Sequence, residues 1–376
     1  MTKKFAFINN QTFVPWGGSE VLWYETALLL RKAGHEVFVY FPKWEVKSRQ
    51  AIELEKAGCQ ITYYNFNRGL KEKILSGVSF LKKDTLSQKS SWLKKIRPDL
   101  LVLTNLAPRG REWMQAAYNN HVKYVSISQL ADELLWHSAE DLGNTAFLYK
   151  NAARIYMLSE ENRIAVQKQL ATSLENVEII YNPFNVDINK PFAYPPLADG
   201  NFNLACVARL GIEHKRQDIL LEIMSDQKWK NRNVFLNIYG KGFHETSLKN
   251  LSQYYGLQKI AFKGHVEDVS SVWDTNHAFV LPSMYEGVSL AMQEALISYR
   301  TSIVSKVGGV SSLIKDNVTG FVSPAATTAL FDEALERAWA RREEWSQIGR
   351  LAGEHIRSII PPDPVGSFAD QIKLLV

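Results

Sequence analysis

A strand, a loop and a helix with two glutamates follow one another in the stretch AFVLPSMYEGVSLAMQEALIS at 278–298. Ser289 is a residue type that caps helix N-termini, so the N–H groups of Val288, Ser289 and Leu290 are expected to be free to hold a phosphate. Glu294 would lie about 7 Å further along the helix axis. That is about the separation between a phosphate and its ribose, and a carboxylate can accept hydrogen bonds from two ribose hydroxyls.

Chemistry alone supports the two glutamates to different degrees. Apolar neighbours of Glu294 predict a helix packed over much of its surface, which favours ligand binding over a solvated helix face. Glu286 stands in a loop, where glutamates are often only solvated, so a functional role and plain solvation both stay open. Gly287 beside it would let backbone approach a ligand closely.

Two cations flank an earlier strand-to-helix loop, in the sequence VARLGIEHK at 207–215. Arg209 follows the predicted strand and Lys215 precedes the predicted helix. An arginine fork and a lysine point charge can converge on a diphosphate. Basic surface residues are common, however, so the pair alone does not distinguish a diphosphate site from a solvated surface.

Glycines mark further strand exits. Gly17 and Gly18, in PWGGSE at 15–20, would bring backbone amides to a phosphate or a sugar. The pattern is not GxGxxG, which argues against a dinucleotide site and leaves a simple turn as the alternative. Gly240 in GKG, and the pair 308–309, are weaker signals of the same kind.

Such loops need a framework of parallel strands, because ligands of open α/β sheets bind beyond the carboxyl ends of strands. Short apolar runs alternate here with helical patterns. The alternation predicts strands at 5–8, 36–40, 100–103, 124–127, 204–208, 234–239, 260–262, 278–281 and 302–305, and helices at 19–32, 217–225, 290–298, 330–344 and 367–375.

A stretch with three prolines, NKPFAYPPLADGN, interrupts this alternation and predicts a linker. We therefore expect an α/β protein with two Rossmann-like, doubly wound domains that face each other across a cleft. The predicted division is an N-terminal domain at 1–188, a linker at 189–201, a C-terminal domain at 202–360, and a terminal helix at 361–376 that packs back on the first domain.

Composition excludes several classes of protein. The 376 residues are 46% hydrophobic and 22% charged, as in ordinary globular proteins. A formal charge of +5 is too small to indicate nucleic acid as a partner. The two cysteines suggest no disulfide framework, and no apolar run is long enough for a signal peptide or a membrane span. We expect a cytoplasmic protein, with peripheral attachment to the inner membrane face left open.

Taken together, the motifs resemble those of the GT-B-fold retaining glycosyltransferases of glycosyltransferase family 4, in the same order along nearly the whole chain. The matching stretches are GGSE at 17–20, YNPFNVD at 181–187, ARLGIEHKRQDIL at 208–220, YGKG at 239–242, FKGHVEDV at 262–269, PSMYEGVSLAMQEAL at 282–296, VGGV at 307–310 and NVTGFV at 317–322.

The resemblance implies a role for each motif. Arg209 and Lys215 would bind the diphosphate of a nucleotide-sugar donor, and Glu286 would contact the hydroxyls of its sugar. Glu294 would bind the ribose, and the 288–290 amides would hold phosphate. Gly17 and Gly18 would approach the donor from the other domain, with Gly240 and His265 near the base. The cations would replace a metal, so no metal or other cofactor is expected.

The chain also departs from the family. Ser289 replaces a glycine found in many members. A histidine common after a strand of the first domain is missing, and Ser128 or Gln129 stands in its place. His137 is eight residues beyond Gln129, and is a weak candidate to replace it. These departures concern the acceptor side more than donor binding.

The implied activity is a retaining hexosyl transfer to a saccharide or lipid-linked acceptor, by front-face attack. Preorganised cations and amides would stabilise the leaving phosphate, and no pair of carboxylates suits a double displacement. The alternatives are a nucleotide-sugar epimerase or a phosphorylase of the same fold, or a non-catalytic partner subunit.

A basic segment at 66–97 could serve a membrane surface, since amphipathic basic segments bind anionic lipid. A solvated helix face explains it equally well. It has two acids, Glu72 and Asp84, and nine cations: Arg68, Lys71, Lys73, Lys82, Lys83, Lys89, Lys94, Lys95 and Arg97.

Overall fold

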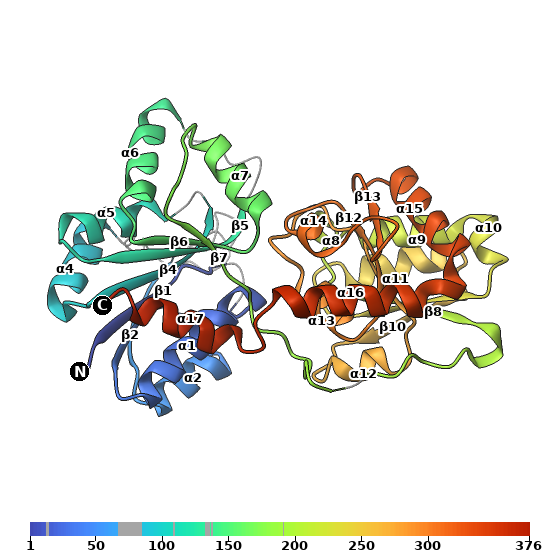
Figure 1. Cartoon of the computed structure of the whole chain (residues 1–376), viewed down its shortest axis with the longest axis horizontal. Helices are drawn as coiled ribbons and strands as arrows, with labels where there is room; N and C mark the ends of the chain where they lie inside the picture. The colour runs from blue at the N-terminus through green and yellow to red at the C-terminus, as the bar shows by residue number, and fades with distance from the viewer. Residues whose placement is uncertain (13–14, 67–84, 108–109, 132–135, 137, 191) are drawn as a thin grey trace. The chain divides into compact units, whose positions relative to one another are not determined.

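The computed structural model describes residues 1–12, 15–66, 85–107, 110–131, 136, 138–190 and 192–376. They form two compact units (Figure 1). The N-terminal unit is Met1–Pro183 with Asp363–Val376, and the C-terminal unit is Phe184–Pro362. Residues 184–201, which include the predicted linker, thus belong to the C-terminal unit.

The N-terminal unit is built on a seven-stranded sheet of order β3-β2-β1-β4-β5-β6-β7, with its strands paired in parallel. The central strand β1 has all but its first residue buried, as expected when helices cover both faces of a sheet. The strands are β1 (Lys4–Asn9), β2 (Glu36–Pro42), β3 (Gln60–Tyr64), β4 (Leu100–Ala107), β5 (Tyr124–Ala131), β6 (Arg154–Met157) and β7 (Val177–Ile179).

Helices lie on both faces of this sheet (Figure 1). The C-terminal helix α17 packs against α1, and Phe368 of α17 meets the ring of Tyr156 edge-on, at 5.0 Å between centroids. The helices are α1 (Val21–Lys32), α2 (Arg49–Lys56), α4 (Leu86–Ile96), α5 (Arg111–Asn119), α6 (Ala139–Lys150), α7 (Glu160–Gln169) and α17 (Pro364–Lys373).

The C-terminal unit repeats the plan with a six-stranded parallel sheet of order β10-β9-β8-β11-β12-β13. Its strands are short and apolar, and β11 and β12 are buried throughout. They are β8 (Phe202–Val207), β9 (Val234–Tyr239), β10 (Ile260–Gly264), β11 (Ala278–Leu281), β12 (Thr301–Ser305) and β13 (Phe321–Ser323).

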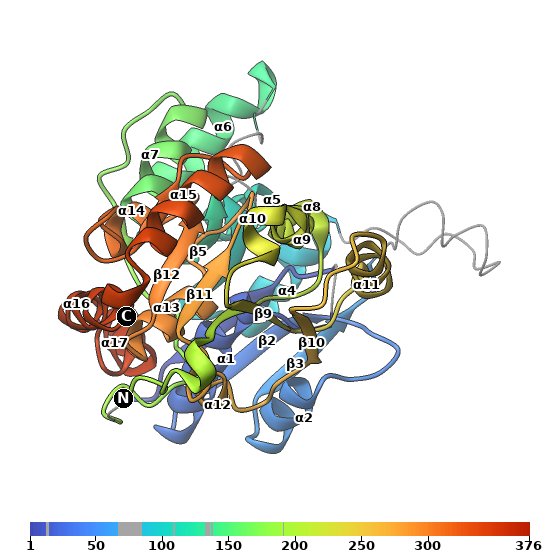
Figure 2. The ribbon, with the colours of Figure 1, turned by 90° about the vertical axis from the view of Figure 1, so that its right-hand side faces the viewer.

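Two helical layers enclose this second sheet (Figure 2). In one layer α9 packs against α10, α11 and α15, and in the other α13 packs against α16. The helices are α8 (Ile212–Lys215), α9 (Gln217–Ser225), α10 (Gln227–Lys230), α11 (Glu245–Tyr254), α12 (Ser270–Trp273), α13 (Leu290–Ile297), α14 (Val310–Leu313), α15 (Thr328–Ala340) and α16 (Trp345–Ile359).

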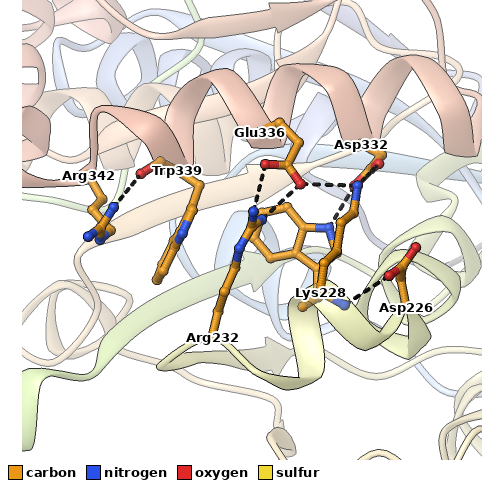
Figure 3. Close-up of polar contacts among 8 residues, drawn as sticks. Asp226, Lys228, Arg232, Asp332, Glu336, Trp339 and Arg342 are labelled. Atoms are coloured by element: carbon orange, nitrogen blue, oxygen red, sulfur yellow. Dashed lines mark hydrogen bonds and ion pairs between the residues drawn. The ribbon is translucent and has the colours of Figure 1, made fainter.

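An ion-pair network fastens α15 to α10 and the turn that follows it (Figure 3). Glu336 on α15 accepts from both terminal nitrogens of Arg232, at 2.9 and 2.8 Å, and pairs with Lys228 at 3.0 Å. The Arg232 guanidinium also lies 4.2 Å from the ring centroid of Trp229. Burial raises the pKa of Glu336, but hydrogen bonds from Arg232 and Lys228 outweigh it and hold the pKa below its usual value.

Residues 67–84 of the predicted basic segment, with Arg68, Lys71, Lys73, Lys82 and Lys83, lie outside the described residues. In the described part of the segment, Lys89 is buried, pairs with Glu112 and faces the ring of Trp113. Lys89 therefore cannot face a membrane, which corrects the expectation for that residue. Lys94, Lys95 and Arg97 are exposed. No helix in the described ranges is long and apolar enough to cross a membrane.

Candidate donor site of the C-terminal unit

The connections of the second sheet reverse direction between β8 and its neighbour β11. Ligands of open α/β sheets bind at such switch points, outside the carboxyl ends of the strands. β8 ends at Val207, just before Arg209, and β11 ends at Leu281, just before the loop with Glu286. Topology alone thus brings the two predicted motifs to one edge of the sheet.

Side-chain contacts join these motifs directly. Lys215, the last residue of α8, forms an ion pair with Glu286, and the Ser283 hydroxyl donates to the same carboxylate oxygen, Oε1, at 2.7 Å. The backbone N–H of Met284 donates to the carbonyl of His214 at 2.8 Å, so the loop after β11 is tied to α8. The side chains of Lys215 and Glu286 are 19% and 12% exposed, so each can still meet a ligand.

Arg209 differs from Lys215 in being exposed, and no described residue accepts a hydrogen bond from its guanidinium. Its backbone is nevertheless held. The side chain of Gln217, which is fully buried, donates to the Arg209 carbonyl at 2.9 Å. Gln217 was not among the predicted site residues. Gln217 stands between two charged residues at the start of a helix, so the sequence did not predict that its side chain would be buried.

Glycines let the surrounding loops pack closely. A Cβ on Gly240 would lie 2.0 Å from the carbonyl oxygen of Ala208, and one on Gly242 would lie 2.2 Å from that of Leu210. Gly240 also has φ +130°, a conformation that L side chains rarely adopt. Packing against the Arg209 loop therefore explains Gly240 without contact with a base.

The VGGV motif buttresses the glutamate loop in the same way. Gly308 has φ +52°, and a Cβ there would lie 2.1 Å from the carbonyl oxygen of Gly287. The N–H of Gly309 donates to that same oxygen at 2.8 Å. The loop after β12 thus fixes the backbone that leads into α13.

The N-terminus of α13 has the predicted cap. Ser289 is the N-cap residue, and its hydroxyl accepts from the Met292 N–H at 3.4 Å. Within the described part of the chain, the N–H groups of Val288, Ser289 and Leu290 donate to no acceptor. With the helix dipole, they form a set of donors suited to a phosphate.

Glu294 lies further along α13 and is only 4% exposed. Its Oε1 accepts two hydrogen bonds from Asn185, one from the backbone N–H and one from the side-chain amide, each at 2.9 Å. Burial raises the pKa of Glu294, and the two bonds from Asn185 act in the opposite direction. The predicted ribose carboxylate is therefore buried, with a partner that sequence reasoning did not find.

His265 is exposed just beyond β10, the edge strand of the sheet, and is separated from β8 by β9. It lies at the same carboxyl edge of the sheet as the cations. Among the predicted residues of this unit, it is the one that follows the edge strand. The described residues contain no group of three or more His, Cys, Asp or Glu side chains that could hold a metal.

Gly17 and Gly18 lie in the N-terminal unit, between β1 and α1. Gly17 caps a short 3-10 helix (Gly18–Glu20), and its carbonyl accepts from the Glu20 N–H at 3.3 Å. Glu20, the last residue of the GGSE motif, had no predicted role, and it is 2% exposed. Its Oε1 accepts from the Ser19 hydroxyl at 2.7 Å, and its buried Oε2 has no hydrogen-bond partner in the described part of the chain. Burial raises the pKa of Glu20 to about 7.

The positions that stand in place of the missing histidine are buried. Ser128 is fully buried, and Gln129 exchanges two amide hydrogen bonds with Asn182, at 3.1 and 2.7 Å. That exchange occupies the polar end of Gln129 within the fold. His137 lies outside the described residues.

Comparison with known proteins relates the C-terminal unit to transferases. Residues 201–341 match the family model described as "Glycosyl transferases group 1". Among curated relatives, the alpha-D-kanosaminyltransferase of Streptomyces kanamyceticus is 28% identical over 134 residues, which cover 35% of this chain and 34% of that protein. A poly(ribitol-phosphate) alpha-N-acetylglucosaminyltransferase of Staphylococcus aureus is 26% identical over 182 residues, 47% of this chain and 35% of that protein. The chain thus spans about a third of the length of these two relatives.

Solved structures resemble the whole chain. HepE of Anabaena in complex with UDP has a TM-score of 0.73 and 17% identity, with 99% of each chain covered. A glycosyltransferase from Rickettsia africae has a TM-score of 0.76 and 15% identity, covering 100% of this chain and 98% of that one. The chain therefore has the GT-B fold, and its residues 201–341 are similar to the group 1 glycosyl transferases.

Proposed function

We propose that this protein is a glycosyltransferase that moves a hexose from a nucleoside-diphosphate donor to a saccharide or lipid-linked acceptor. The observation that carries the proposal is the cluster at the β8–β11 switch point. There, Lys215 and Glu286 are in contact, and Glu286 is close in the chain to the N–H groups of residues 288–290, which donate to no acceptor among the described residues. A cation and free amides suit the diphosphate, and the carboxylate suits the hydroxyls of the sugar.

Charge at this site acts on the leaving group. As the bond between the anomeric carbon and the donor phosphate breaks, negative charge grows on the phosphate oxygen. Lys215, Arg209 and the amides of 288–290 would stabilise that charge, which is commonly the largest contribution to catalysis. The cations would do this without a metal ion.

We further propose that transfer retains the anomeric configuration, as the family 4 resemblance implies. The acceptor hydroxyl attacks the anomeric carbon from the face that the phosphate leaves. The new carbon–oxygen bond forms, the old one breaks, and the hydroxyl proton passes to the leaving phosphate. In this mechanism Glu286 contacts the donor sugar and forms no covalent intermediate.

Donor and acceptor class are supported by relatives. HepE has been solved with UDP-glucose bound, which puts UDP-sugars first among donors to test. The Staphylococcus aureus relative is named for transfer to poly(ribitol-phosphate). For a lipid-linked acceptor, the exposed Lys94, Lys95 and Arg97 would favour an anionic membrane. Co-sedimentation with anionic liposomes at low salt tests that point, and its absence would remove the membrane from the proposal.

The test is nucleotide release from UDP-, GDP- and ADP-sugars, with wild type beside Arg209→Ala and Glu294→Ala. We expect slow release from one donor, strongly reduced in both variants. Lys249→Ala is the charge-matched control, because Lys249 is exposed on α11 and pairs with Glu245. Silence with every donor, and no thermal shift with any nucleotide, would instead indicate a non-catalytic partner subunit.

A further inference from the structure

The carboxylate of Glu294 is held asymmetrically. Both hydrogen bonds from Asn185 end on Oε1, and in the described ranges no residue donates to Oε2. Asn185 and Glu294 are 109 residues apart in sequence, but both belong to the C-terminal unit. One oxygen is thus committed to the protein, and the other is available.

The chain segment that carries Asn185 is anchored independently of this contact. The Arg357 guanidinium donates to the Ile188 carbonyl at 3.4 and 3.3 Å. Arg300, which is fully buried, donates to the Ala193 carbonyl at 2.7 Å. These bonds hold the backbone near Asn185 in place, so loss of the Asn185 side chain alone would leave its backbone N–H able to reach Glu294.

A nearly buried carboxylate is costly to keep ionised unless donors compensate it. Two N–H groups on one oxygen reduce that cost, and they also fix the rotation of the carboxylate plane. With Oε1 occupied, Oε2 keeps its lone pairs for a ligand hydroxyl. Asn185 itself is exposed, so no packing requirement explains an amide at this position.

We propose that Asn185 is a positioning residue for the donor ribose, which orients Glu294 so that Oε2 accepts a hydrogen bond from a ribose hydroxyl. This inference rests on the proposed function, in which Glu294 binds ribose. A stand-in role would be the opposite arrangement, in which the Asn185 amide occupies the place of the hydroxyl and leaves when the donor binds. The two roles predict opposite changes in affinity when the amide is removed.

The experiment measures dissociation constants by calorimetry for a nucleoside diphosphate, with the base chosen by the donor panel, and for its 2′-deoxy and 3′-deoxy analogues. Asn185→Ala should weaken binding of the ribonucleotide about tenfold, because Glu294 loses the side-chain donor that turns its Oε2 toward the ribose hydroxyl. At least one deoxy analogue should bind Asn185→Ala and wild type equally, because that analogue lacks the hydroxyl that donates a hydrogen bond to Glu294. A general structural defect would weaken all three ligands alike.

Two further variants separate the outcomes. Asn189→Ala, an exposed asparagine on the same segment, should bind all ligands as wild type does. Glu294→Ala should lose the preference for the ribonucleotide. If Glu294→Ala keeps that preference, the ribose role of Glu294 is wrong. If Glu294→Ala loses it while Asn185→Ala binds normally or more tightly, only the positioning role is overturned. Asn185→Ser serves the same purpose should Asn185→Ala fold poorly.

Discussion

Carboxylates at the carboxyl edges of the two sheets are held in different ways. In the C-terminal unit Glu286 contacts Lys215 and Ser283, and Glu294 receives two N–H groups from Asn185. In the N-terminal unit Glu20 accepts from the Ser19 hydroxyl, and its second oxygen is buried with no hydrogen-bond partner among the described residues.

The two sheets share one topological plan, so the plan does not cause this difference. It follows from the local partners. Burial raises the pKa of Glu294 as it raises that of Glu20, but in the second unit two N–H groups of Asn185 act against it, and Glu286 has a cation beside it. The carboxylates of the second unit therefore have N–H or cationic partners, whereas in the first unit burial raises the pKa of Glu20 to about 7.

Removal of the Lys215 charge in the C-terminal unit should have the largest effect on activity. Lys215→Ala should lower kcat by about 10²- to 10³-fold, the usual loss when one preorganised group that stabilises developing charge is removed. Turnover of the donor identified by the panel is the measurement, with Lys249→Ala as the control. Equal turnover in Lys215→Ala and wild type would show that the cation is not used on the phosphate.

Neutralising the Glu20 carboxyl in the N-terminal unit should change the pH dependence of stability. The pKa of Glu20 is raised from its ordinary 4.5 to about 7. The stability that the protonated carboxyl contributes is therefore fully present below pH 4.5 and is lost as pH rises through 7. Glu20→Gln should therefore be more stable than wild type at pH 8, by roughly 3 kcal/mol at most, and the gain should shrink toward pH 5. Urea unfolding at both pH values measures it, and a gain that does not depend on pH would contradict the assignment.

The network of Figure 3 should give the smallest effect, and on stability alone. Glu336→Gln removes the charge that pairs with Arg232 and Lys228 and should cost about 1 kcal/mol, as partly exposed ion pairs do. Its lowered pKa means that this contribution is present at neutral pH and is lost as pH falls through that pKa. Nucleotide affinity should not change. A changed affinity would mean that the α15 layer takes part in donor binding.

Much of the fold could be predicted because its signals are local. The predicted strands at 234–239 and 278–281 and the helix at 217–225 agree with the structure residue for residue. The edge strand β3 was missed because none of its residues is fully buried, so its apolar pattern is weak. Helix α16 was missed because its start follows directly on the predicted helix at 330–344, with only a short turn between them.

The candidate site divides along the same line. Short motifs placed Arg209 and Glu286 after strand ends and Lys215 before a helix, and the structure brings Lys215 and Glu286 into contact. Asn185, Gln217 and Glu20 lie within the matching stretches at 181–187, 208–220 and 17–20, but no role was predicted for them. Their roles depend on partners distant in sequence or on burial, and neither shows in the type of a single polar residue.

The most direct test of the donor site compares a nucleoside with its diphosphate. Calorimetric dissociation constants would be measured for both ligands with wild type, Arg209→Ala and Lys215→Ala. Wild type should bind the diphosphate at least tenfold more tightly, as one charge-assisted hydrogen bond alone would provide, and each variant should lose most of that ratio while binding the nucleoside as before. If both variants keep the full ratio, the diphosphate does not bind at the β8–β11 edge and the account of this site is wrong.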